Sequence, residues 1–114
     1  MRERRGYKRK QTRHHTSVRS MPEGRVVGRL VDITTTGLML LASRPIPPGH
    51  EMKLRIPLRV MVHDMHEIEI SAVTVWCRPD ANPSFHRIGF EIPDIGGIEA
   101  YAIETVLSHL HLVG

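Results

Sequence analysis

Apolar and polar residues alternate along several short segments of the chain, and this pattern limits the possible folds more than any other feature of the sequence. Residues 52–59 alternate between apolar side chains and charged side chains or proline. A period of two is typical of a β-strand that buries one face, and Pro57 predicts a sheet edge or a β-bulge at the end of this strand. Residues 88–92 repeat the alternation in a last strand, with Ile88, Phe90 and Ile92 on one face.

Other segments rich in β-forming residues predict further strands. An apolar, β-branched run over residues 26–33 is broken by residues 34–37 and resumes over residues 38–42. This spacing predicts two strands joined by a tight loop. Another strand is expected over residues 68–76, with Ile68, Ile70, Ala72 and Trp76 on one face. Residues 11–20 are polar and favour a strand only weakly, and turns are expected at residues 21–24, 45–49, 63–64 and 79–83.

The C-terminal segment has a different period. Ile103, Val106, Leu107 and Leu110 recur at helical spacing, which predicts one amphipathic helix over residues 98–111. Six short strands with Gly and Pro turns, followed by one helix, predict an all-β fold. We expect a six-stranded antiparallel β-barrel with a C-terminal α-helix. A length of 114 residues suits a single domain of this kind.

Charge is distributed unevenly along the chain. Residues 1–25 hold nine Lys or Arg and two Glu, a net charge of +7, whereas residues 26–114 hold seven bases and ten acids, a net charge of −3. Residues 1–10 show no periodicity and are predicted to form a basic arm, with the barrel domain over residues 11–114. Such an arm either binds an anionic partner or serves as a solvated tail.

Composition excludes several classes of protein. The single cysteine, Cys77, allows no intrachain disulfide, so a secreted disulfide scaffold is excluded. No apolar run approaches the length of a transmembrane helix, and no apolar stretch follows the basic N-terminus as in a secretory signal. We therefore expect a cytoplasmic protein that does not insert into a membrane. The five aromatic residues are too few and too scattered for a nucleic-acid stacking platform, so we expect no nucleic-acid partner.

No pattern of catalytic or metal-binding residues is found. The eight histidines have no cysteine partners at zinc-ligand spacing, and adjacent His14 and His15 would point to opposite faces of a strand. No nucleophile lies in a glycine elbow, and no phosphate-binding glycine motif occurs. The sequence therefore favours a binding module over an enzyme, with no catalytic residue and no metal site.

Two motifs carry the functional prediction. Arg5 and Arg9 form an R-x-x-x-R pair in the arm, a spacing that also occurs elsewhere in this arginine-rich chain. Residues 32–37 read Asp-Ile-Thr-Thr-Thr-Gly and follow the second expected strand. A simple turn would also explain this segment, with Asp and Thr capping the local backbone and Gly37 at positive φ.

Together the two motifs suit one kind of ligand. Arginine matches the O6 and N7 acceptors of guanine and pairs with phosphate. A carboxylate can accept from the N1–H and amino donors of guanine, and a hydroxyl can bind phosphate. A ligand that contains both guanine and phosphate would use every one of these groups.

At these residues the sequence resembles the PilZ domain family, the bacterial receptor module for cyclic di-GMP. The family signatures are R-x-x-x-R and [D/N]-x-S-x-x-G, and the resemblance extends over nearly the whole chain. It includes a V-x-V-W segment at residues 73–76 and a strand similar to the family's G-[VF]-x-F pattern at residues 88–91. The family fold is a six-stranded antiparallel barrel with a C-terminal helix, which agrees with the strand pattern.

The resemblance implies a set of ligand-binding residues. Arg5 and Arg9 would bind the guanine edges and phosphates of cyclic di-GMP, and Arg4 is a further basic candidate. Asp32 would accept from guanine, Thr34 would offer the hydroxyl that serine usually supplies, and Gly37 would let the backbone approach closely. Thr34 is the one departure from the family pattern, because threonine adds a methyl group and stiffens χ1.

Two functions remain open at this point. The first is a cyclic di-GMP sensor, whose arm clamps the ligand against the D-x-T-x-x-G loop and alters contacts with an effector protein. The second is a protein-interaction adaptor that keeps the barrel without binding the ligand. Because no further domain is predicted, either form would act in trans on motility, exopolysaccharide synthesis or another cyclic di-GMP output.

Overall fold

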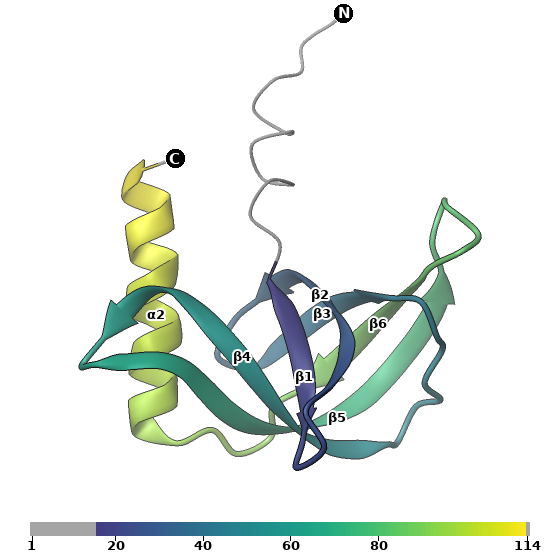
Figure 1. Ribbon diagram of the computed structural model, residues 1–114, viewed down its shortest axis with the longest axis horizontal. Helices are drawn as coiled ribbons and strands as arrows, with labels where there is room; N and C mark the ends of the chain where they lie inside the picture. Colours follow the sequence, from purple (N-terminus) through teal and green to yellow (C-terminus); the bar gives the residue numbers. More distant parts are fainter. Residues whose placement is uncertain (1–15, 114) are drawn as a thin grey trace, which may run out of the picture.

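The computed structural model describes the backbone of residues 16–113 and side chains as far as residue 108. In this part of the chain, six strands precede the helix α2, which spans Gly97–Val113 (Figure 1). The strands are β1 (Ser17–Met21), β2 (Arg25–Ile33), β3 (Gly37–Ala42), β4 (Glu51–Val62), β5 (Met65–Pro79) and β6 (His86–Glu91). The predicted fold class, six antiparallel strands and a C-terminal helix, is confirmed.

The strands close into a barrel in the order β1-β2-β3-β6-β5-β4, and every neighbouring pair is antiparallel. β1 closes the barrel by pairing with β4 through three residues, where Arg19, Ser20 and Met21 lie opposite Arg55, Leu54 and Lys53. Closure pairs the edges that an open sheet would leave exposed. It also fixes, for each strand residue, whether its side chain points into the core or to the outside.

The irregular positions follow the sequence signals. The β4–β5 register shifts between Pro57 and Val62, so Pro57 precedes a bulge as predicted. His63 and Asp64 form the expected turn, with φ of 49° and 64°, at the tip of a hairpin much longer than the other strand pairs. Within the weakly predicted segment 11–20, β1 begins at Ser17 and extends to Met21, and residues 11–15 lie outside the described residues.

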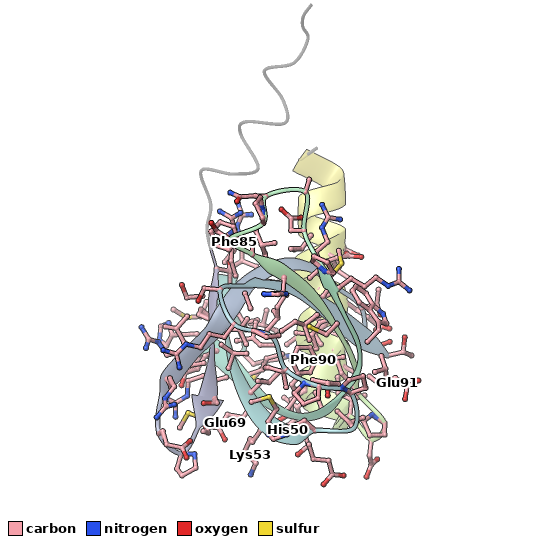
Figure 2. All side chains as sticks on the ribbon, turned by 90° about the vertical axis from the view of Figure 1, so that its right-hand side faces the viewer. His50, Lys53, Glu69, Phe85, Phe90 and Glu91 are labelled. Carbon is pink, nitrogen blue, oxygen red and sulfur yellow. The ribbon has the colours of Figure 1, made fainter. Side chains whose placement is uncertain are left out.

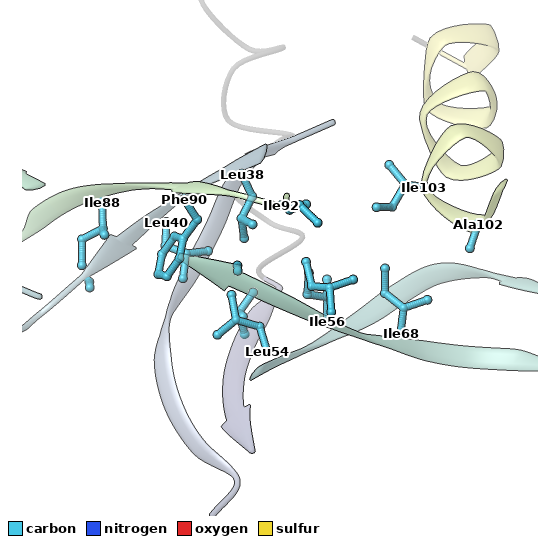
Figure 3. Close-up of a cluster of buried hydrophobic side chains, with 14 of the residues drawn as sticks. Leu38, Leu40, Leu54, Ile56, Ile68, Ile88, Phe90, Ile92, Ala102 and Ile103 are labelled. Carbon is cyan, nitrogen blue, oxygen red and sulfur yellow. The ribbon is translucent and has the colours of Figure 1, made fainter. Parts of the chain in front are cut away.

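The core fills the barrel and continues beneath α2. Leu40, Leu54 and Ile88 are completely buried inside the barrel. In Figure 3, Ile56 lies between this group and Ile68. Ile103, which belongs to α2, is part of the same cluster of buried side chains. Full burial of one such aliphatic side chain is worth about 1.5–3 kcal/mol. The helix therefore belongs to the same core as the barrel.

Helix α2 packs against the long β4–β5 hairpin. Ala102 and Ile103 are buried on the helix side of this contact. At the hairpin tip, the His63 ring lies 5.4 Å from the Tyr101 ring, measured between centroids. Among residues 16–113, no helix combines the length and apolar character that a membrane crossing would need.

Thr74 holds the loop between β3 and β4 in place. Its side chain is 1% exposed, and its hydroxyl donates to the carbonyl of Pro47 at 2.7 Å and accepts from the backbone N–H of His50 at 2.8 Å. Two backbone hydrogen bonds join Thr74 to Gly49 and His50 as well. A buried hydroxyl is stable here because both of its hydrogen-bonding functions are satisfied.

We expect Thr74→Val to lower the free energy of unfolding by about 1–3 kcal/mol, because valine leaves the Pro47 carbonyl and the His50 N–H without their partner. Urea denaturation followed by circular dichroism measures this change. Thr105→Val on the half-exposed side of α2 is the matched control and is expected to change stability little. Equal effects of the two substitutions would show that the Thr74 hydrogen bonds do not stabilise the loop.

Candidate functional site

A β-bulge in β2 turns Asp32 to the outside of the barrel. Leu30 lies opposite Leu40, which points into the core, and the register then shifts so that Asp32 lies opposite Met39. Without the extra residue, Val31, the side chains of Leu30 and Asp32 would share the inner face. The Asp32 carboxylate is exposed, and within the described part of the chain it forms no hydrogen bond or ion pair.

Thr34 shapes the loop that follows β2. Its N–H donates to the carbonyl of Gly37 at 2.8 Å, and its hydroxyl lies 3.2 Å from the hydroxyl of Thr36 and accepts from the Thr36 N–H at 3.3 Å. The Thr36 carbonyl in turn accepts from the N–H of Ile92, which joins the loop to the end of β6. Threonine therefore performs a structural role in this loop, and its side chain is still exposed to solvent.

Gly37 is required for a close approach between strands, and the expectation of a positive φ is wrong. Gly24 and Gly49 are the glycines with positive φ among residues 16–113. A Cβ on Gly37 would lie 2.6 Å from the carbonyl oxygen of Phe90 in β6. Any side chain would push β3 away from β6 at the base of the loop.

A second bulge, in β5, turns Trp76 outward. Thr74 lies opposite Phe90 on the inner face, and the register then shifts so that Trp76 lies opposite Gly89. The prediction that Trp76 shares a face with Ile70 and Ala72 is therefore wrong, because Val75 is an extra residue in the strand. The indole lies directly over Gly89, where a Cβ would overlap it. Cys77 instead points inward and packs, half-buried, against the core.

The two bulges bring Asp32 and Trp76 into one row across four strands. The row runs from Asp32 on β2 through Met39 on β3 and Gly89 on β6 to Trp76 on β5. Its length is about 14 Å, given a spacing of about 4.8 Å between strands. We refer to these four residues as the outer-face row. An acceptor therefore stands at one end of the row and an aromatic ring at the other.

Three arginines form the neighbouring row on the same face. Arg29, Arg87 and Arg78 are connected through Leu41, which lies opposite both Arg29 and Arg87. The Arg78 guanidinium lies 5.0 Å from the Trp76 ring centroid, in cation–π range. The outer face of β2, β3, β6 and β5 thus carries positive charge beside the outer-face row.

Asp80 orients one of these arginines. Its carboxylate accepts from Nε of Arg87 at 2.7 Å and from the N–H of Asn82 at 3.1 Å. The hydrogen bond from Arg87 holds the pKa of Asp80 below its usual value, and the Asn82 N–H acts in the same direction. Asp80 therefore stays ionised well into the acidic range and keeps Arg87 in a fixed orientation.

The arm residues Arg4, Arg5 and Arg9 lie outside the described residues, so their predicted roles stay predictions, as does the arm boundary at residue 10. The described part of the chain begins at Thr16. The carbonyl of Thr16 accepts from the N–H of Leu30 at 2.8 Å. Thr16 therefore lies beside β2, opposite a residue two positions before Asp32.

The chemistry of this surface is that of ligand binding. It offers an exposed carboxylate as acceptor, guanidinium groups as donors to an anion, and an indole on which a ring can stack. In the part of the chain that the structure describes, no three His, Cys, Asp or Glu side chains lie close enough to hold a metal ion.

Comparison with known proteins agrees with this geometry. The PilZ domain family matches the chain over residues 3–107. Among solved structures, the chain is similar to that of the Bacillus subtilis inhibitor of motility (MotI/DgrA), with a TM-score of 0.70 and 18% sequence identity. The likeness covers 87% of this chain and 48% of that chain, so this chain spans about half the length of that relative. The search of curated proteins finds no match.

The fold is a closed six-stranded barrel with a C-terminal helix, and the family match makes its class specific. The chain belongs to the PilZ domain family, a family of cyclic di-GMP receptors and adaptors in bacterial signalling. The predicted family membership is confirmed.

The sequence predicts Asp32, Thr34 and Gly37 as candidate site residues, and these stay predictions, but it does not point to the other residues of this face. Trp76, Arg78 and Arg87 come from β5 and β6, more than forty residues after Asp32. The outward position of Trp76 and Arg78 depends on a bulge in β5 that period-two alternation does not reveal. The available signal was Gly89, because a glycine inside a strand pattern often marks the close approach of another group.

We expect Gly89→Ala to displace the Trp76 indole from the barrel surface, because the added methyl group would occupy the position of the ring. Trp76 is the only tryptophan of the chain, so its fluorescence reports this position alone. The emission maximum should move to longer wavelength, and quenching by acrylamide should increase. Gly97→Ala, where a Cβ meets nothing within 4 Å, is the control. Identical spectra for both variants and the wild type would contradict the position of Trp76.

Proposed function

We propose that this PilZ protein is a cyclic di-GMP receptor that binds its ligand on the outer face of β2, β3, β6 and β5 and passes the signal to an effector protein. The observation that carries this proposal is the exposed Asp32 carboxylate. It has no partner in the described part of the chain and shares the outer-face row with Trp76. The family match supports the choice of ligand.

Each part of the ligand has a complementary group on this surface. Asp32 accepts from the N1–H and amino group of a guanine, while a guanine ring stacks on Trp76 and Arg78. Base–aromatic stacking contributes about 1–3 kcal/mol per base. Arg87, oriented by Asp80, pairs with a phosphate oxygen. The protein acts by binding and catalyses no reaction on the ligand.

In this proposal the arm completes the site. Arg9 precedes Thr16 by seven residues, and an extended segment of seven residues is up to about 24 Å long. Arg9 can therefore reach any part of the outer-face row, and Arg4 and Arg5 can reach further. Guanidinium groups of Arg5 and Arg9 bind guanine edges and phosphate, with Arg4 as an additional cation.

Binding then changes the surface that the protein presents. The arm, residues 1–10 with a net charge of +5, is held against the barrel by a ligand that carries two negative charges. An effector protein acting in trans, in the cytoplasm, would detect the new position and charge of the arm. Motility and exopolysaccharide synthesis are the outputs that the family resemblance suggests.

Calorimetric titration with cyclic di-GMP tests the proposal. We expect saturable binding by the wild type and loss of at least about tenfold in affinity in Arg9→Ala and in Asp32→Ala, because each removes a hydrogen bond that involves a charged group. Asp94→Ala and Arg59→Ala remove the same side-chain types from exposed positions elsewhere and should leave the affinity unchanged.

Heats indistinguishable from dilution in a folded wild-type protein would overturn the receptor proposal. The alternative, a PilZ adaptor that contacts its partner without ligand, would then hold. Equal losses in the site variants and in the two controls would show that the outer face is not the binding site.

The Thr34 loop leads to a separate expectation. Thr34→Ser keeps the hydroxyl and should keep the affinity for cyclic di-GMP within about twofold. Thr34→Val removes the hydroxyl that the Thr36 N–H uses and should weaken binding roughly 2- to 13-fold, equivalent to about 0.5–1.5 kcal/mol. The same titration measures both variants. A Thr34→Ser protein that binds much more tightly than the wild type would show instead that the threonine methyl group obstructs the ligand.

A further inference from the structure

A second concave site lies at the end of the barrel where β1 turns into β2, the lower end in Figure 1. The pocket has a volume of about 780 Å³, within the range of small-molecule sites. Its walls come from the end of β1, the β1–β2 turn, the start of β2, the loop over residues 43–50 and the start of β4. His50, one of its lining residues, is labelled at the lower end of the barrel in Figure 2.

Two arginines whose side chains have no partner among the described residues line this pocket. Of the eight arginines between residues 16 and 108, four have their side chain in a hydrogen bond, an ion pair or a cation–π contact, and Arg29 also has a partner. The three without such a contact in the described part of the chain are Arg25, Arg44 and Arg59. Arg25 and Arg44 both line this pocket. Guanidinium groups left unpaired at one pocket are suited to bind an anion.

Other lining residues restrict the type of anion. Glu23 and Glu51 line the pocket and are exposed, so they oppose a polyanion and can accept from N–H or O–H donors of a ligand. Met21 and Met52 provide an adaptable apolar surface on which a flat ring can lie. A ligand that suits these groups has one phosphate, an apolar ring and hydrogen-bond donors.

One wall of the pocket is rigid. The loop over residues 43–50, which carries Arg44 and His50, is joined to β5 by the four hydrogen bonds at Thr74. These hydrogen bonds hold the backbone of residues 47–50 in place before a ligand arrives, which lowers the entropic cost of ordering this part of the loop on binding.

We propose that this pocket is a second binding site, specific for a nucleoside monophosphate. Arg25 and Arg44 hold the phosphate, with the His50 ring beside them. The base lies on Met21 and Met52, and Glu23 and Glu51 accept from its amino and ring N–H groups or from the ribose hydroxyls. Guanine, with adjacent N1–H and amino donors, suits the two carboxylates well.

This pocket is separate from the outer face. None of its lining residues belongs to the outer-face row or to the arginine row beside it. Arg25 begins β2, whereas Asp32 lies near its end. At about 3.3 Å per residue, the two side chains are roughly 23 Å apart along the strand. The inference therefore does not depend on cyclic di-GMP binding.

Titration with guanosine 5′-monophosphate, followed by ¹H–¹⁵N NMR of the full chain, tests the second site. We expect saturable shift changes at Ser43, Arg44 and His50. The affinity should fall at least about tenfold in Arg25→Ala and in Arg44→Ala. Arg59→Ala removes the third unpartnered arginine from a different surface and should bind normally, and Asp32→Ala should also bind normally. Guanosine, which lacks the phosphate, should bind at least about tenfold more weakly than the monophosphate.

Three results would overturn the inference. The first is no saturable change around the pocket at millimolar nucleotide in the folded protein. The second is binding that Asp32→Ala abolishes while Arg25→Ala and Arg44→Ala retain it, which would assign the nucleotide to the outer face. The third is equal affinity for guanosine and its monophosphate, which would exclude a phosphate site. Unchanged spectra outside the pocket confirm that the arginine variants are folded.

Discussion

Closure of the antiparallel barrel is the constraint on which the rest of the structure depends. Once β1 pairs with β4, the side chain of each strand residue points either into the core or to the outside. Successive side chains alternate strictly between these two faces wherever the strand has no bulge. Only a bulge can change this assignment. The extra residues Val31 and Val75 each change it once, and they turn Asp32 and Trp76 to the outer face. The candidate binding surface exists because these two bulges fall in strands that share a row.

The same closure explains the two glycines of this face. Gly37 lies where the β2–β3 loop meets β6, and a Cβ there would collide with the carbonyl oxygen of Phe90. Gly89 lies beneath the indole of Trp76. Because neither residue has a side chain, another group can approach the outside of the barrel closely at both positions. The inside of the barrel is filled by aliphatic side chains such as Leu40 and Ile88. A stable core and the close packing of the outer face at these two glycines are therefore compatible on the same strands.

Polar groups are arranged differently at the two candidate sites. On the outer face, Arg87 is oriented by Asp80 and Arg78 lies over Trp76, so the cations are already positioned by contacts within the protein. In the pocket at the end of the barrel, Arg25 and Arg44 have no such contact among the described residues, while the loop that carries Arg44 is fixed by Thr74. A ligand at this second site would supply the missing partner itself.

The strands, the helix and the family are predicted correctly from local patterns in the sequence. These patterns are local, so they can be recognised without knowing which distant residues are in contact. They are the alternation over residues 52–59 and 88–92, the turn at His63 and Asp64, and the helical spacing of Ile103 and Val106. The D-x-T-x-x-G motif likewise identified Asp32, Thr34 and Gly37. Three features become apparent only in the tertiary structure. They are the outward face of Trp76, the close packing at Gly37, and the position of arginines from β2, β5 and β6 beside the outer-face row. These features arise from register between strands far apart in the chain, and a single inserted residue such as Val75 reverses every orientation that follows it.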